Sequence, residues 1–336
     1  MSASLKDPSL TVPTPPKGDR GGSVGIARNL GLVIALVVLC VVGVVTAGER
    51  FASTDNIVTI LRLATVTGVV AIGMTFVITG GGIDLSVGAI VALASVWATT
   101  TGTQAMADDV HWIVIVLSAL LVGTACGVIN GLLVAYGRIV PFVATLAMLA
   151  SARALAELIA DRKTQILRNQ GFTDFFGAEP LGIPVIVIIF ALVTVGGWFL
   201  LNRTTFGRRT FAVGGNPEAA RLAGIKVQRH TVYLYALLGM TCGIAALIVM
   251  SRTTTGSSTH GTLLELDVIA AVVIGGTLLS GGRGTVVGTL FGVLIFTTLT
   301  NVFTLNNLST STQNVAKGVI IVIAVLLQQR IANRKP

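Results

Sequence analysis

Asp84 is the residue whose type and position raise the main chemical question in this sequence. It lies in the segment GGGIDLSVG, residues 80–88, between two long apolar runs. An ionisable group at membrane depth points to a functional role, such as lining a path for a polar solute. The simpler reading is that Asp84 caps the following helix and accepts hydrogen bonds from amides near Ser86 and Val87. We favour capping, and a pathway role, alone or combined with capping, stays open.

Sequence patterns of catalysis are mostly missing from this chain. There is no HExxH and no GxGD motif, and GxSxG occurs at residues 21–25, within the polar N-terminal tail. The absence of any Gly-Lys dipeptide excludes a P-loop of the GxxxxGK[ST] type. The three cysteines lie in apolar runs without metal-ligand spacing, as small core residues do: Cys40, Cys126 and Cys242. We therefore predict no catalytic residue and no metal site, and any ATP hydrolysis must come from another chain.

The composition defines the elements that hold these residues. Apolar residues make up 53% of the 336-residue chain and charged residues only 11%. A run of about 20 apolar residues can cross a hydrocarbon core about 30 Å thick. We therefore predict an all-α, polytopic helical membrane protein with about ten transmembrane helices. The expected spans are 29–48, 57–78, from the 80–88 segment to about 99, 111–136, 141–160, 183–201, 231–250, 266–279, 285–305 and 314–328.

The basic residues behind the net charge of +9 are concentrated between these spans. Nucleic-acid binding would need a folded basic face with interleaved aromatic residues, which the sequence lacks, so we expect no nucleic-acid partner. If the N-terminus is cytoplasmic, the inner segments hold 15 Lys and Arg against four Asp and Glu. The positive-inside rule therefore predicts that both termini and the 203–229 loop are cytoplasmic. We expect a disordered tail over 1–27, a transmembrane domain over 28–330 and a short tail over 331–336.

The 203–229 loop is the longest polar interruption of the chain, with six basic residues and one Glu. It contains the signals of a short helix. Asn216 suits the N-cap position, and Pro217 suits the first helical turn. Glu218 lies in the first turn, where its negative charge is stabilised by the positive end of the helix dipole. Gly224 suits the position just past the end of the helix. This pattern predicts a capped helix on a membrane face, placed to contact another protein.

Glycine spacing predicts close helix packing. The stripes Gly123-x3-Gly127-x3-Gly131 and Gly284-x3-Gly288-x3-Gly292 each put small residues on one helical face. We expect contacts within the chain rather than a homodimer seam, which stays the alternative.

Two further patterns concern the spans themselves. The pattern Gly-Gly-x4-Val-Gly occurs at 81–88 and again at 281–288, and paired Gly-interrupted segments can mark a transport pathway.

Arg153 and Glu157 are four residues apart on the fifth span, where we expect them to pair.

Several segments together resemble the ribose/xylose/arabinose-type permeases of ABC importers. The most specific is GMTFVITGGGIDLSVG at 73–88. The others are INGLLV at 129–134, FGR at 206–208 with AVGGN at 212–216, ELDVIA at 265–270 and GGTLLSGG at 275–282. The resemblance covers nearly everything from the second span to the ninth.

This resemblance implies an ABC importer permease fold and a subunit that translocates a monosaccharide such as ribose, xylose, arabinose or galactose across the bacterial inner membrane. It also implies a second permease copy (homodimer or heterodimer), a cytoplasmic ABC ATPase subunit and a periplasmic or lipid-anchored sugar-binding protein, besides the membrane lipid. ATP and Mg would bind to the ATPase, and this chain would bind no cofactor.

Two groups of residues acquire expected roles from the resemblance. The run from Glu218 to Gly224 is similar to the EAA-x3-G loop by which importer permeases engage their ATPase. It implies an ATPase-coupling set of Asn216, Pro217, Glu218, Ala219, Ala220, Arg221 and Gly224. The signature segment and nearby polar positions give candidates for the solute path, namely Thr75, Thr79, Gly81, Gly82, Asp84, Ser86, Gly88, Asn130 and Thr145.

Alternatives remain at this point. Similar permeases carry other small polar solutes, such as autoinducer-like furanones or nucleosides. From another class, an ion-coupled secondary transporter would usually keep ionisable groups at mid-span, and few occur here.

Overall fold

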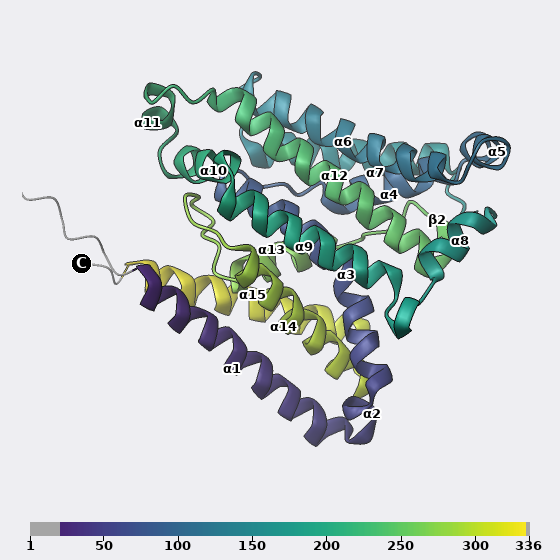
Figure 1. Ribbon diagram of the computed structural model, residues 1–336, viewed down its shortest axis with the longest axis horizontal. Coiled ribbons are helices and arrows are strands. Elements are labelled where there is room, and N and C mark those ends of the chain that lie inside the picture. The colour runs from purple at the N-terminus through teal and green to yellow at the C-terminus, as the bar shows by residue number, and fades with distance from the viewer. Residues whose placement is uncertain (1–20, 334–336) are drawn as a thin grey trace, which may run out of the picture.

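The computed structural model of the protein describes residues 21–333, and most of them lie in helices (Figure 1). Residues 1–20 of the expected N-terminal tail, and 334–336 at the other end, lie outside the described residues. The first helix begins at Gly21, so residues 21–27 of that expected tail are helical.

Seven helices among the described residues are long and apolar enough to cross a membrane. They form because uninterrupted apolar runs satisfy every backbone hydrogen bond within the segment. Their bounds are α1 (Gly21–Ala47), α3 (Thr54–Thr79), α6 (Ile113–Ala135), α7 (Pro141–Ile159), α9 (Val185–Arg203), α12 (Val227–Thr253) and α14 (Val286–Leu305). A further long helix, α15 (Thr310–Asn333), occupies the place of the expected tenth span.

The expected third and eighth spans each contain only a short helix. These helices are α4 (Val87–Ala98) and α13 (Leu264–Ile274), with 12 and 11 residues. At 1.5 Å per residue each measures less than about 20 Å and cannot cross alone. Non-helical segments flank them, 80–86 before α4 and 275–285 after α13, and each segment contains glycines with positive φ.

Short elements lie at the two ends of the long helices. One end carries α10 (Thr205–Gly215) and α11 (Pro217–Leu222), and we call it the α11 end. The opposite end, the α5 end, carries α2 (Glu49–Ala52), α5 (Thr101–Asp109), α8 (Gln170–Gly177) and the 3₁₀ turn Pro180–Gly182. It also holds a two-residue antiparallel pair of β1 (Gln165–Ile166) and β2 (Thr255–Gly256). Figure 1 shows α10 and α11 on the left and α5 and α8 on the right.

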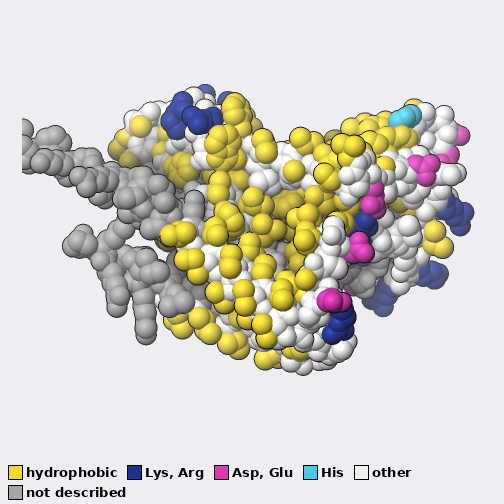
Figure 2. Space-filling model, turned by 60° about the horizontal axis from the view of Figure 1, so that its bottom comes forward, with side chains coloured by type: hydrophobic (Ala, Val, Ile, Leu, Met, Phe, Trp, Pro, Cys, Tyr) yellow, Lys and Arg dark blue, Asp and Glu magenta, His cyan; other side chains and the backbone are white. Residues whose placement is uncertain are grey.

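The core is built around α3, α4 and α12, whose apolar side chains form most of one continuous buried cluster. Outside it, exposed apolar side chains form a broad band between the two ends (Figure 2). Such a band matches the hydrocarbon layer of a membrane. Cys126 and Cys242 are buried and Cys40 is half-buried, and all three are free thiols, as predicted.

Both glycine stripes pack within the chain, as the sequence analysis favoured. Gly123 and Gly127 of α6 lie against Gly239 of α12, and a Cβ on any of these glycines would meet backbone atoms of the other helix. The second stripe packs α14 on α13, because Gly288 lies against Gly275 in the same close way. Each contact allows two backbones to approach to a distance that larger side chains would prevent.

The predicted pair between Arg153 and Glu157 does not form. Arg153 donates hydrogen bonds to the backbone carbonyl oxygens of Ser258 and His260, the second over 2.9 Å. The guanidinium of Arg153 therefore binds backbone carbonyl oxygens of the 257–263 loop instead of the Glu157 carboxylate. The Glu157 carboxylate instead lies 3.4 Å from Nε of Arg162, at the turn that follows α7.

Candidate functional site

The predicted short helix in the polar loop is α11, and its capping follows the sequence closely. The Asn216 side chain accepts a hydrogen bond from the amide of Ala219 at 3.0 Å, and Pro217 is the first helical residue. Gly224 follows the C-cap residue with φ +82°, a left-handed conformation that favours glycine. The loop is more ordered than expected, because α10 precedes α11 and the two helices join directly at Asn216.

Most of α11 faces outward and is free to bind a partner. Among its six residues only Ala220 is buried, and the Leu222 side chain is 76% exposed. Glu218 and Arg221 form an ion pair with hydrogen bonds of 3.1 and 3.2 Å from Nε of Arg221 to the carboxylate. Arg221 lowers the pKa of the Glu218 carboxyl from its usual value, so this surface carries a fixed pair of opposite charges at neutral pH.

Two open hollows border the turn from α11 into α12. One lies between α11, the start of α12 and Tyr136, and the other between α10 and the start of α12. Four basic residues line them, Arg209, Arg221, Lys226 and Arg229, against the single acidic Glu218. The α11 end therefore combines a projecting helix with a basic surround, which suits an acidic groove on a partner.

The C-terminal end of α10, next to the start of α11, reaches both Gly-rich breaks. A Cβ on Gly214 would overlap the carbonyl oxygen of Thr79 and would lie 2.7 Å from the amide nitrogen of Gly282. That amide donates a hydrogen bond to the same Thr79 carbonyl at 2.9 Å. Gly81 and Gly281 lie in contact, with φ of +86° and +82°. We call the contact of Thr79, Gly81, Gly214, Gly281 and Gly282 the glycine junction.

Asp84 lies in the non-helical segment before α4 and is fully enclosed. One carboxylate oxygen accepts hydrogen bonds from the amide and the hydroxyl of Ser86, at 2.7 and 2.6 Å. The other accepts from Nδ2 of Asn130 on α6, at 3.0 Å. Helix α4 begins at Val87 with Ser86 as its N-cap residue, so Asp84 binds the cap residue instead of capping the helix itself.

The same cluster holds a buried acceptor that the chain does not satisfy. Nδ2 of Asn130 also donates to the Ser86 hydroxyl, at 2.9 Å, while its Oδ1 is buried and has no hydrogen-bond partner among the described residues. The Thr79 hydroxyl, at the glycine junction, is likewise buried without a partner in residues 21–333. Buried polar atoms of this kind are uncommon, and they mark positions where a water or a polar solute could bind.

The remaining path candidates do not join this cluster. The Thr75 hydroxyl bonds that of Thr289 on α14, at 2.7 Å. Gly88 packs against Gly261 and Glu265, and the Thr145 hydroxyl donates to the Pro141 carbonyl of its own helix at 2.9 Å. Gly82 lies beside Tyr235, whose hydroxyl donates to the Ile83 carbonyl at 3.1 Å.

Sequence reasoning missed the role of Gly214 and of Tyr235. Gly214 was one residue of a matching motif, and nothing in its spacing indicated contact with two distant breaks. The repeated Gly-Gly-x4-Val-Gly pattern was the available signal, because it named the two segments that the structure brings together.

These features define a class. The chain is a multi-pass helical membrane protein with two Gly-broken segments that meet beside a projecting helix. The family described as "Branched-chain amino acid transport system / permease component" matches residues 56–325. The chain belongs to this family, and within it to the sugar permeases of ABC importers, which are transport subunits.

Three relatives illustrate the likeness. The ribose import permease protein of Bacillus subtilis is 44% identical over 91% of this chain and 94% of its own. The L-arabinose ABC transporter permease protein of Azospirillum brasilense is 36% identical over 100% and 98%. The xylose transport system permease protein of Escherichia coli is 30% identical over 97% of each chain. No solved structure matches the chain significantly. With its seven apolar helices and bacterial relatives, the protein is a multi-pass protein of the inner membrane.

Proposed function

We propose that this protein is the permease subunit of an ATP-driven importer for a pentose. The family supports the ABC importer assignment, and the relatives named above are permeases for ribose, arabinose and xylose, which are all pentoses. The permease carries no ATP site of its own in this proposal. ATP and Mg bind to a separate ATPase subunit, and a sugar-binding protein delivers the solute.

The observation that carries the proposal is the placement of α11 and α10 between the solvent and the glycine junction. Helix α11 projects from the protein and is exposed on most of its surface, as a docking element must be. Helix α10 connects directly to it and touches Thr79 and Gly282 through Gly214. Movement of α11 by a partner would therefore be passed to the segments before α4 and after α13.

We assign the α11 end to the cytoplasm, because the loop 203–229 holds six basic residues and one acidic residue. The ATPase would bind there, and the sugar-binding protein would dock on the α5 end. Coupling then requires that the two nucleotide states of the ATPase make different contacts with α11.

The solute path in this proposal passes the Asp84 cluster. Asp84, Ser86 and Asn130 offer carboxylate, hydroxyl and amide groups, the kinds of group that bind sugar hydroxyls, and Oδ1 of Asn130 has spare acceptor capacity within the part of the chain that is described. The cluster is enclosed in this structure, so a second conformation must open it. A junction made of backbone contacts between glycines is suited to such a change, because no side chains interlock across it.

The test is uptake into proteoliposomes that contain the permease, its ATPase and its binding protein. Labelled ribose, xylose and arabinose should accumulate only when ATP is supplied to the ATPase side, and collapse of proton and sodium gradients should leave the rate unchanged. Uptake driven by an ion gradient without ATP would overturn the importer proposal. Uptake of a nucleoside or a furanone in preference to every pentose would overturn the substrate class alone.

A further inference from the structure

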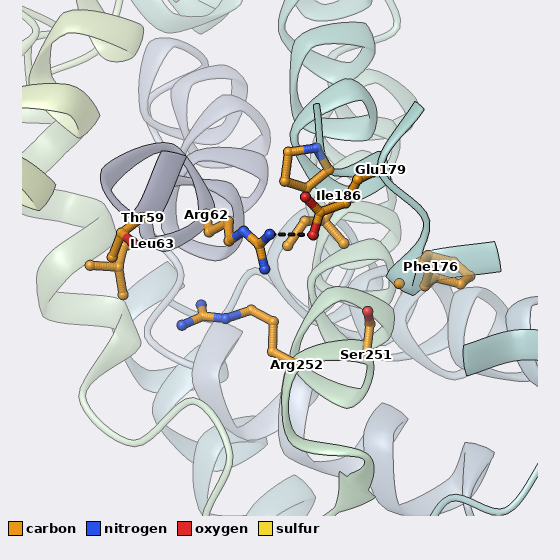
Figure 3. A pocket seen from close by; sticks show the side chains of 10 residues that line it. Thr59, Arg62, Leu63, Phe176, Glu179, Ile186, Ser251 and Arg252 are labelled. Carbon is orange, nitrogen blue, oxygen red and sulfur yellow. Dashed lines mark hydrogen bonds and ion pairs between the residues drawn. The ribbon is translucent and has the colours of Figure 1, made fainter. Parts of the chain in front are cut away.

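A hollow at the α5 end holds two arginines that the proposed transport path does not use. It lies between the outer parts of α3 and α12 and the connection from α8 to α9, with a volume of about 290 Å³. Its polar lining consists of Thr59, Arg62, Glu179, Ser251 and Arg252. Figure 3 shows Arg62 and Arg252 reaching into it from α3 and α12.

The charges of the hollow are not balanced. Arg62 pairs with the Glu179 carboxylate, the one acidic group of the lining. Arg252 has no ion-pair or hydrogen-bond partner in residues 21–333, and neither has the Ser251 hydroxyl beside it. The hollow therefore contains two guanidinium groups but only one carboxylate, and the unpaired donors Arg252 and Ser251 come from consecutive positions at the end of α12.

We propose that this hollow binds the phosphate group of an anionic phospholipid. A phosphate oxyanion would neutralise the excess charge and accept hydrogen bonds from Arg252 and Ser251, and guanidinium groups match phosphate oxygens with two parallel bonds. A neutral sugar would leave the second guanidinium without a counter-charge, so the hollow suits an anion better than the transported solute.

The apolar part of the lining favours a lipid over free phosphate. Leu63, Phe176, Pro184 and Ile186 form the rest of the wall. Next to it, the side chains of Ile183 and Leu181 are 49% and 100% exposed. A headgroup in the hollow would thus have exposed apolar surface beside it for its acyl chains. With the orientation proposed above, the lipid belongs to the outer leaflet.

The experiment is native mass spectrometry of the purified permease with added phosphatidylglycerol or phosphatidylcholine of matched acyl chains. We expect the wild-type protein to retain phosphatidylglycerol in preference, and Arg252→Gln to reduce the bound fraction about ten-fold, the size of one charge-assisted hydrogen bond. Ser251→Ala, a milder change, should reduce it in the same direction. The matched control is Arg162→Gln, an exposed arginine at the same end but outside the hollow.

Equal retention of phosphatidylglycerol by wild type, Arg252→Gln and Arg162→Gln would overturn the proposal. Two other results would also overturn it. If inorganic phosphate alone raised the unfolding temperature of the wild type but not of Arg252→Gln, and lipid had no effect, the ligand would be a free anion. If Arg252→Gln weakened only the binding of the sugar-binding protein, the hollow would serve a protein partner. None of these results depends on transport, so the test is independent of the proposed function.

Discussion

The amide of Gly282 donates a hydrogen bond to the carbonyl oxygen of Thr79 over 2.9 Å. This bond joins the break that follows α3 to the break that follows α13, although the two residues are far apart in the chain. It also satisfies backbone groups that would otherwise be costly to leave unpaired within the protein. Gly214 of α10 packs against the same bond. The helix that leads to α11 therefore contacts both breaks at one point.

Gly214→Ala should disturb the glycine junction, because the added methyl group would overlap the Thr79 carbonyl. We expect a loss of about 1–3 kcal/mol in the free energy of unfolding, typical of overpacking, and a loss of uptake. Gly215→Ala is the matched control, since nothing lies within 4 Å of its added Cβ. Thermal unfolding in detergent and uptake in proteoliposomes measure both variants. Equal behaviour of the two would contradict the role of the junction.

Asp84→Asn and Asp84→Ala separate a structural role from a pathway role. Asparagine keeps an oxygen for the Ser86 donors, and Asn130 can turn its unpaired oxygen toward the new amide. Alanine removes all three hydrogen bonds and should cost about 2–4 kcal/mol of stability. Folding and transport retained by the asparagine variant alone would support a structural role. Loss of transport in both variants, with assembly intact, would show that the carboxylate serves the solute path.

Gly127→Ala should destabilise the monomer, because its Cβ would overlap the backbone carbonyl of Tyr235 in the seam between α6 and α12. The expected loss is about 1–3 kcal/mol. Gly196→Ala on α9 is the control, with open space around the new methyl group. Unfolding temperatures and the monomer–dimer distribution, measured over a range of protein concentrations, distinguish a seam within one chain from a seam between two copies. A change in the monomer–dimer distribution with no change in unfolding temperature would place the seam between two copies.

The ion pair of Lys317 and Asp267 should hold α15 to the short helix α13. Its Nζ–Oδ2 distance is 3.1 Å, and the two side chains are 15% and 28% exposed. Either Lys317→Met or Asp267→Asn should cost about 1–3 kcal/mol, because each leaves a poorly hydrated partner without its counterpart. The exchanged pair Asp267→Lys with Lys317→Asp should recover part of the loss. A double-mutant cycle on thermal unfolding checks this, and additive losses would mean that the two groups do not interact.

The capped helix was predictable from sequence because its signals are local. Asn216, Pro217 and Gly224 each act on their immediate neighbours, so their spacing alone defined α11 correctly. The apolar runs likewise predicted the membrane helices, since hydropathy depends on composition within one segment.

The short lengths of α4 and α13 and the hydrogen-bond partners of Asp84 could not be predicted in this way. Hydropathy does not distinguish an apolar helix from apolar extended chain, so α4 and α13 were both counted among the ten expected spans. The partner of Asp84 on another helix, Asn130, and the carbonyls that bind Arg153 come from parts of the chain that meet only after folding. Contacts of this kind depend on helix packing, which the spacing within one segment does not report.

The most direct test of the account compares ATP hydrolysis with pentose uptake in the reconstituted importer carrying Glu218→Lys or Gly224→Pro. Proline cannot adopt the φ of +82° at Gly224, and the charge reversal removes the pair with Arg221 on the exposed surface of α11. We predict that both variants insert and that ATP hydrolysis continues while uptake falls about ten-fold or more. Gly196→Ala on α9, with open space around the new methyl group, should leave both rates unchanged. Normal uptake by either α11 variant would contradict the assignment of this helix to ATPase coupling.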